Sequence, residues 1–258
     1  MRYCRWLEDG QARVGRIEGE PGAGATVVEL RDLPWRSLEE TGETRAFEGI
    51  ELLVPTLATK IVCVGQNDRR HAAEMNKPVP AEPLIFLKPP SALNPHNAPI
   101  RLPPVSEDVQ HESELGLVIG RRLSKVDEAE AAAGIFALTC INDVTARDVQ
   151  RRETQHTRAK GYDTFACVGP WMVSGLNPDD LRVRCLVNGE VRQEGRTSDL
   201  VFSPAKLVSF MSHIMTLEPG DLISTGTPPG VGRLQAGDLV EVDIEGIGTL
   251  RNPVLESA

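Results

Sequence analysis

The segment Val109-Gln-His-Glu-Ser-Glu-Leu-Gly-Leu-Val-Ile-Gly120 carries two carboxylates at the start of an apolar run. Successive side chains of a strand point to opposite faces, so Glu112 and Glu114 share one face. Leu115, Leu117 and Ile119 share the other face. Adjacent carboxylates repel each other unless a positive charge lies between them. The segment therefore predicts a strand with one face in the core and the other in solvent or at a cation.

A third carboxylate, Asp143, follows 29 residues after Glu114, in Thr139-Cys-Ile-Asn-Asp-Val-Thr-Ala-Arg-Asp148. Mg²⁺ favours oxygen ligands from a few carboxylates, completed by water and substrate. The residues alone leave two interpretations open, a metal site and a solvated strand face, because Glu-x-Glu is a common pattern.

The bulk properties exclude several classes of protein. The chain has 258 residues, net charge −9 and 4% aromatic residues, which argue against nucleic-acid binding. The absence of a long apolar run and of a signal-peptide pattern predicts a cytoplasmic protein that does not bind membranes. The five widely spaced cysteines predict reduced, buried thiols. The sequence has no Cys-x-x-Cys pattern, so a structural zinc site is not expected.

The chain is expected to divide into a small N-terminal β module, residues 1–55, and a larger catalytic part, residues 56–258. Strand-like runs at Ala12–Ile17 and Ala25–Leu30 belong to the module, and the Glu-rich segment Leu38–Thr44 is interpreted as a solvated connector. The alternative is that the first 55 residues are an irregular extension of a single domain.

The larger part is rich in β signals. Ile61–Val64 is a short apolar strand, and Asn188-Gly189 between apolar runs is a strong two-residue hairpin signal. Leu239–Ile244 and Ile247–Leu250 form a second expected hairpin. This pattern predicts an α+β, mainly β fold. Helices are predicted at Asp68–Met75, Val126–Ala133, Thr145–Glu153 and Lys206–Met215.

Six stretches follow one another in a characteristic order: Val62-Cys-Val-Gly-Gln-Asn-Asp-Arg-Arg-His71, Phe86-Leu-Lys-Pro89, His111-Glu-Ser-Glu-Leu115, Asn142-Asp-Val-Thr-Ala-Arg-Asp-Val-Gln150, Ala159-Lys-Gly-Tyr-Asp-Thr-Phe165 and Ser224-Thr-Gly-Thr-Pro-Pro-Gly-Val-Gly232. Together they resemble the fumarylacetoacetate hydrolase superfamily, in its acylpyruvate hydrolase or 2-hydroxyhepta-2,4-diene-1,7-dioate isomerase-like branch. The resemblance implies a rolled, mixed β-sandwich core and a homodimer. It also implies that Glu112, Glu114 and Asp143 bind Mg²⁺, with Mn²⁺ and Ca²⁺ as alternatives.

His71 and Glu74 are three residues apart and share one face of a predicted helix, where a carboxylate can orient an imidazole as a general base. The alternative is a solvated pair without a role. The resemblance implies a mobile lid whose His-Glu pair activates a water, with the Pro-rich segment Met75–Pro83 as its hinge. Asp68 departs from the family pattern, because many relatives have Tyr there.

Lys160 follows Asp143 by 17 residues. An isolated lysine is usually a surface residue, but the resemblance places this one beside the metal, where its ammonium can stabilise an enolate or carbonyl oxygen. His156 is a second departure from the family, which often has Trp, and it is interpreted as a wall residue or a secondary proton carrier.

Four residues are predicted to bind substrate. Lys88 is expected to face a substrate carboxylate, and Arg147 and Gln150 to bind the same ligand or to hold carboxylates that surround the metal ligands. For Arg147 a surface ion pair is the alternative. The loop Ser224–Gly232 lacks the P-loop ending, but its amides and the Thr227 hydroxyl can hold an anion; the alternative is a plain turn. The resemblance implies that Gly-Thr-Pro holds the substrate's carboxylate.

With these residues, the resemblance implies a Mg²⁺-dependent enzyme that hydrolyses the C–C bond of a 2,4-dioxo acid of the acylpyruvate or fumarylpyruvate type. Its partner is a small anionic 2-oxo acid, and its products are pyruvate and a carboxylic acid. Two enzymatic alternatives share the enolate: isomerisation or tautomerisation of a 2-hydroxymuconate-type diacid from aromatic catabolism, and decarboxylation of oxaloacetate. A non-catalytic ligand-binding protein is the contrasting class.

Overall fold

The computed structural model describes residues 1–74 and 78–256. The helices are α1 Arg69–Glu74, α2 Glu128–Gly134, α3 Arg147–Arg152, α4 Thr157–Lys160 and α5 Pro204–Ile214. The strands are β1 Arg2–Glu8, β2 Gln11–Glu18, β3 Thr26–Leu30, β4 Glu40–Ala46, β5 Glu51–Leu53, β6 Ile61–Gly65, β7 Leu84–Lys88, β8 Leu93–Asn94, β9 Ile100–Leu102, β10 Val109–His111, β11 Ser113–Ile119, β12 Ile135–Asp143, β13 Thr145–Ala146, β14 Ala166–Val173, β15 Arg182–Val187, β16 Glu190–Arg196, β17 Leu222–Ser224, β18 Gly232–Arg233, β19 Leu239–Ile244 and β20 Gly248–Glu256. The predicted α+β, mainly β fold is confirmed.

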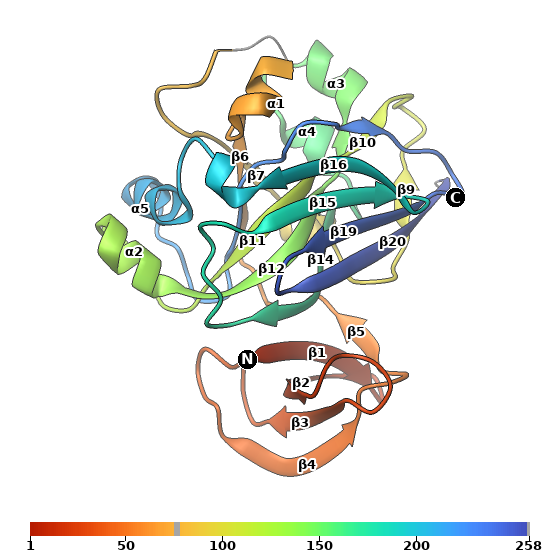
Figure 1. The fold of residues 1–258 in the computed structure, drawn as a ribbon, viewed down its shortest axis with the longest axis vertical. Helices are drawn as coiled ribbons and strands as arrows, with labels where there is room; N and C mark the ends of the chain where they lie inside the picture. Colours follow the sequence, from red (N-terminus) through yellow and green to blue (C-terminus); the bar gives the residue numbers. More distant parts are fainter. Residues whose placement is uncertain (75–77, 257–258) are drawn as a thin grey trace.

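Two large sheets form a sandwich. One follows the order β4-β3-β2-β1-β14-β12-β11-β17-β6-β7, and the other follows β16-β15-β19-β20-β9. Figure 1 shows the second sheet lying over β11, β12 and β14 of the first. Strand pairs such as β17 with β6 are parallel and others are antiparallel, so the sandwich is mixed. Within the described residues, no helix is long and apolar enough to cross a membrane.

Strand β11 lies at the centre of the larger sheet, between β12 and β17. Its side chains alternate as predicted: Leu115, Leu117 and Ile119 pack in the core between the two sheets. The other face is buried as well, because Val118 belongs to a second apolar cluster and Glu114 is 1% exposed. Of the two interpretations of this face, the structure therefore removes the solvated one.

The N-terminal strands join the same large sheet, because β1 pairs with β2 on one side and with β14 on the other. Tyr3 and Trp6 on β1 are each 1% exposed. The prediction of a connector at Leu38–Thr44 is wrong for the backbone conformation, because most of this segment belongs to β4, which pairs with β3. Its side chains are mostly exposed, as expected for a polar strand at a sheet edge. The division after residue 55 stays a prediction.

The helices differ from their predicted limits for local reasons. α3 begins at Arg147 because Thr145 and Ala146 pair with β10 as β13. α2 begins after Asp127, whose side chain accepts a hydrogen bond from the Glu130 amide and caps the helix. The short α4 is not among the predicted helices. The predicted end of α1 at Met75, and the first residues of the proposed hinge, lie outside the described residues, and residues 78–83 form neither helix nor strand.

Both predicted hairpins are present. Asn188 and Gly189 have φ angles of 54° and 80° and connect β15 to β16, as a two-residue turn with positive φ at both positions requires. β19 and β20 form the second hairpin. The five cysteines are free and buried, also as predicted.

Candidate active site

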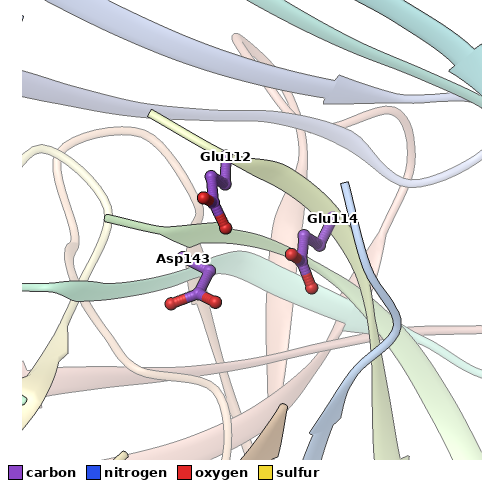
Figure 2. Close-up of side chains that lie close together, drawn as sticks. All are labelled: Glu112, Glu114 and Asp143. Atoms are coloured by element: carbon purple, nitrogen blue, oxygen red, sulfur yellow. The ribbon is translucent and has the colours of Figure 1, made fainter. Parts of the chain in front are cut away.

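Three carboxylates meet where β11 and β12 run side by side. Glu114 lies on β11, Glu112 lies just before it, and Asp143 ends β12. The Asp143 amide donates to the Glu112 carbonyl at 2.8 Å, which holds the ends of the two strands together. The three residues offer ligand atoms that all lie within 4.8 Å of one another, and Figure 2 shows the three carboxyl groups gathered at one place. The three predicted metal ligands are therefore brought together.

Three basic side chains surround this cluster. Lys160 Nζ donates to Glu112 Oε2 at 2.8 Å and to Asp143 Oδ2 at 2.6 Å. Arg147 forms an ion pair with Glu112, and Lys88 forms one with Asp143. Burial raises the pKa of Glu112, but the positive charges of Lys160 and Arg147 outweigh it and hold that pKa below its usual range. Burial also lowers the pKa of Lys160, and the neighbouring carboxylates reverse this, so Lys160 is an ammonium.

Glu114 has a different environment from the other two acids. Its Oε2 accepts hydrogen bonds from Ser224 Oγ at 2.6 Å and from the Gly226 amide at 2.7 Å, which leaves Oε1 as a ligand atom. Burial and the charges of Asp143 and Glu112 raise the pKa of Glu114 to about 8. A buried carboxylate beside two others is costly unless a cation offsets it. This donor set is all oxygen, which fits a hard divalent cation.

Lys88 lies behind the acid cluster. Its side chain is 1% exposed, and besides Asp143 it donates to the carbonyl oxygens of Val144 at 3.1 Å and Phe165 at 2.6 Å. An ammonium has three protons to donate, and these three acceptors use all of them. This geometry differs from the expectation that Lys88 faces a substrate carboxylate, because its partners are protein oxygens.

The predicted His-Glu pair forms on α1. His71 Nδ1 lies 3.0 Å from Glu74 Oε2, and the Glu74 carboxylate also accepts a hydrogen bond from the Gly230 amide at 3.1 Å. The Asp68 carboxylate accepts from the backbone amides of Arg70 at 2.8 Å and His71 at 2.9 Å. Asp68, the departure from the family pattern, therefore caps α1 and fixes the start of the helix that carries His71.

A cavity of 60 Å³ brings the histidine of α1 next to the acid cluster, because His71, Glu112, Glu114 and Lys160 all line it. The predicted substrate-binding residues apart from Lys88 line it too. They are Arg147, Gln150 and Thr227.

The side chains of these three residues have protein partners. Arg147 donates to Gln110 Oε1 at 2.8 Å and to Gln150 Oε1 at 2.5 Å, in addition to its ion pair. The Thr227 hydroxyl donates to the Ser113 carbonyl at 3.0 Å, which joins the 224–232 loop to β11. Arg147 is 4% exposed, so the alternative of a surface ion pair is wrong.

Gln193 on β16 is a buried residue of the site that the sequence did not reveal. Its Oε1 accepts from the Ser113 amide at 3.0 Å and contacts His111 Nδ1 at 2.9 Å. Its Nε2 donates to Thr227 Oγ1 at 2.8 Å and to the Pro228 carbonyl at 2.7 Å. It thereby joins the strand of the acids to the 224–232 loop. A separation of 80 residues from Ser113 leaves no local pattern that announces this contact.

Phe86 is a second residue of the site that was not predicted, although it lies in the family motif Phe86-Leu-Lys-Pro89. Lys160 Nζ lies 4.8 Å from the centre of its ring, and the His156 ring meets it edge-on at 5.4 Å. Both Phe86 and His156 line the cavity, so His156 is a wall residue. Strand alternation places Phe86 on the same face as Lys88, and this signal was available in the sequence.

A mixed β-sandwich with a buried carboxylate cluster, a lysine and a His-Glu pair around one small cavity defines a class of enzymes that act on small acids. Residues 60–255 match the family model described as "Fumarylacetoacetate (FAA) hydrolase C-terminal". The chain belongs to this family. Residues 1–55 match a second model, "Rv2993c-like, N-terminal". Protein Rv2993c of Mycobacterium tuberculosis is 48% identical over 260 residues, which cover 99% of this chain and 98% of the relative.

Other relatives carry names of more than one reaction. A 2,4-didehydro-3-deoxy-L-rhamnonate hydrolase of Sphingomonas sp. is 38% identical and covers 99% of this chain and 96% of its own. A 5-carboxymethyl-2-hydroxymuconate delta-isomerase structure from Mycobacterium smegmatis matches all of both chains with a TM-score of 0.94 at 44% identity. A fumarylpyruvate hydrolase structure from Pseudomonas aeruginosa, in complex with Mn²⁺ and pyruvate, covers 78% of this chain and 91% of its own, with a TM-score of 0.75 at 29% identity. The family thus includes hydrolases, isomerases and a member with a bound divalent metal.

Proposed function

We propose that this protein is a Mg²⁺-dependent hydrolase that cleaves the C3–C4 bond of a 2,4-dioxo acid into pyruvate and a carboxylic acid. The observation that carries the proposal is that His71, which Glu74 contacts at Nδ1, lines the same cavity as Glu112 and Glu114 of the acid cluster. An enolate-forming site needs the acids and a lysine, whereas the hydrolytic reaction also needs a base that activates water.

Glu112, Glu114 and Asp143 would hold the cation in this proposal. When bound, the cation supplies Lewis acidity toward the oxo-acid end of the substrate and a fixed point for its orientation. Mg²⁺ is preferred over softer metals because the donor set is all oxygen, and the relative with Mn²⁺ supports a divalent ion at such a site.

The protein's own residues then carry the proton transfers. Glu74 holds Nδ1 of His71, which leaves Nε2 to take a proton from a water in the cavity. The resulting hydroxide adds to the C4 carbonyl, the C3–C4 bond breaks, and its electron pair stays with the pyruvate part as an enolate. C3 finally takes the proton that His71 holds. The Lys160 ammonium, which lines the cavity, stabilises the enolate oxygen.

Other residues hold this arrangement in place. Lys88 keeps Asp143 oriented from behind, and Arg147 does the same for Glu112. Thr227 would receive the substrate's carboxylate at the cavity wall through its backbone amide, because its hydroxyl donates to Ser113 and the Gly226 and Gly230 amides donate to Glu114 and Glu74.

Isomerisation of a 2-hydroxymuconate-type diacid is the second candidate. It is favoured by the isomerase structure that matches the whole chain at 44% identity. Such a reaction moves a proton and a double bond and consumes no water, so the two candidates differ in their products.

The test is release of pyruvate from acetylpyruvate in Mg²⁺, with an EDTA-treated sample as the control. We expect pyruvate in the first sample and none in the second. A wild-type protein that converts a hydroxymuconate diacid, but releases no pyruvate from any acylpyruvate, would replace the hydrolase proposal with the isomerase.

A further inference from the structure

The cavity around the acids is too small for a whole substrate. Its volume is 60 Å³, and about 10–15 Å³ of such volume corresponds to one water-sized position. A cation and the oxo-acid end of a ligand fill this space. The part of a 2,4-dioxo acid beyond C4 must therefore lie outside the cavity.

A larger hollow of 570 Å³ adjoins the cavity, between β7 and the segment 154–157. Gly65, Gln66, Phe86 and His156 line both spaces, so the two are adjacent. Gln66 has a φ angle of 57°, an uncommon value for a non-glycine residue and one that often marks a functional site. We call this hollow the outer groove.

One face of β7 runs from the acids to the outer groove. Lys88, Phe86 and Leu84 alternate onto this face. Lys88 contacts Asp143, the Phe86 ring lies against the Lys160 ammonium, and Leu84 is 47% exposed and lines the groove. A ligand that extends from the acid cluster along this strand therefore passes Phe86 and reaches Leu84.

The β7 side of the outer groove is apolar, with Pro83, Leu84, Ile85 and Leu87, and Met215 adds to it. The segment 154–157 makes the other side polar, but among the described lining residues there is no lysine, arginine, aspartate or glutamate. A second carboxylate that moved there would lose water without meeting a cation, whereas an alkyl chain gains by leaving water.

We propose that the outer groove binds the distal substituent of the substrate, and that this substituent is a neutral, apolar chain. This inference rests on the proposed function and narrows its substrate class to acylpyruvates with an apolar acyl group, in preference to dicarboxylic dioxo acids. The groove adjoins the cavity of the acid cluster and shares four lining residues with it, which identifies the substrate as its occupant.

The kinetic test compares acetyl-, butanoyl- and hexanoylpyruvate, and adipoylpyruvate as the carboxylated partner of the last. We expect kcat/KM to rise by about threefold to fourfold per added methylene, mainly through KM. Adipoylpyruvate should react at least tenfold less efficiently than hexanoylpyruvate. Pyruvate release that is independent of chain length, or faster with the carboxylated compound, would contradict the proposed role of the outer groove. It would leave the hydrolase proposal unaffected.

A binding test does not depend on hydrolysis. Calorimetry in Mg²⁺ should show 2-oxohexanoate binding more tightly than 2-oxobutanoate, and more tightly than 2-oxoadipate. If this order of affinities holds but no acylpyruvate releases pyruvate, the proposed role of the outer groove is supported and the hydrolase proposal fails. Equal affinities for the three compounds would contradict the proposed role of the groove.

Leu84→Lys should shift the preference toward the carboxylated ligands, because it places a cation in the groove. Leu239→Lys is the matched control, since Leu239 is a 39% exposed strand residue outside the groove, and it should leave the preference unchanged. If Leu84→Lys alters only the molar mass in sedimentation and not the ligand preference, a second copy of the chain covers the groove and the proposal is wrong.

Discussion

At the scale of single residues, the site is organised by buried ion pairs in which one base contacts more than one acid. Lys160 contacts two of the three acids, whereas Glu112 and Asp143 each have a further base of their own. Glu114 has only hydroxyl and amide donors among its described contacts. The charge of the cluster is therefore least balanced at Glu114, and metal binding should depend on that residue.

Metal removal should change stability in a way that follows from this imbalance. At a free Mg²⁺ concentration of 100 times Kd, binding to the native state adds about 2.7 kcal/mol and should raise Tm by about 5–10 °C. Glu114→Ala should abolish both this rise and the activity, while Glu29→Gln, a buried acid on β3, should keep both. Differential scanning calorimetry with Mg²⁺ or EDTA measures the effect. An unchanged Tm in wild type would contradict the metal site.

Substitution of His71 should separate water activation from enolate formation. His71→Ala should reduce acylpyruvate hydrolysis by about 10²–10⁴-fold, because a general base is lost. Any oxaloacetate decarboxylation should fall much less, since no water is activated. Lys160→Ala should depress both reactions, because both pass through the enolate. The assays are pyruvate release from both substrates in saturating Mg²⁺. Equal losses for His71→Ala would mean that His71 acts by closing α1 over the site.

At the scale of elements, α1 is a six-residue helix that depends on its contacts. A helix this short has little stability of its own in water. Asp68 caps its first turn, Arg70 pairs with Asp199, and Glu74 reaches the Gly230 amide. The position of His71 therefore depends on the cap and on two contacts with distant loops.

The cap can be tested directly. Asp68→Ala removes an N-cap contribution of about 0.5–2 kcal/mol, so kcat should fall by about twofold to 30-fold. The pH profile should keep its shape and Mg²⁺ affinity should not change, because His71 and the acids remain. Asp68→Asn keeps an oxygen acceptor and should restore most of the activity. If Asn and Ala are equally impaired, the charge of Asp68 matters and not the cap.

At the scale of the whole molecule, one sheet extends from the N-terminal strands to β7 beside the acids. β1 pairs with β14, and β14 pairs with the strand that ends at Asp143. The Tyr3 ring packs 5.7 Å from Phe136 on β12. The first 55 residues thus share backbone hydrogen bonds and apolar packing with the sandwich, although separate family models match the two parts.

This continuity predicts a single unfolding transition. In urea, far-UV circular dichroism, tryptophan fluorescence and enzymatic activity should be lost together, because separating β1 from β14 exposes buried apolar surface and a free strand edge. Trp6 and Trp171 report on the two sides of this contact. A first transition that changes the Trp6 signal but leaves activity intact would show that the N-terminal part is an independent module.

Features that depend on local pattern could be predicted from the amino-acid sequence alone. Alternation along β11 placed Glu112 and Glu114 on one face, and Asn188-Gly189 specified a hairpin, because both are consequences of backbone geometry within a few residues. The ordered motifs led to the family and to its mainly β fold. The homodimer and the choice of Mg²⁺ remain predictions of that resemblance, and the cytoplasmic location remains a prediction from the cysteines and the lack of a signal-peptide pattern.

Contacts between side chains that are far apart in the sequence could not be predicted, because they depend on how the folded chain brings distant strands together. Lys88 was expected at the substrate but lies behind Asp143, because the pairing of distant strands, not the motif, sets what a strand residue faces. Gln193 joins β11 to the 224–232 loop through contacts that no local pattern records. The β4 edge strand was hidden in the same way, since its polar side chains lack the apolar alternation that marks a strand, and only its pairing with β3 defines it. Burial of both faces of β11 is likewise a property of the assembled sandwich, and it is what buries the acids of the proposed cation site.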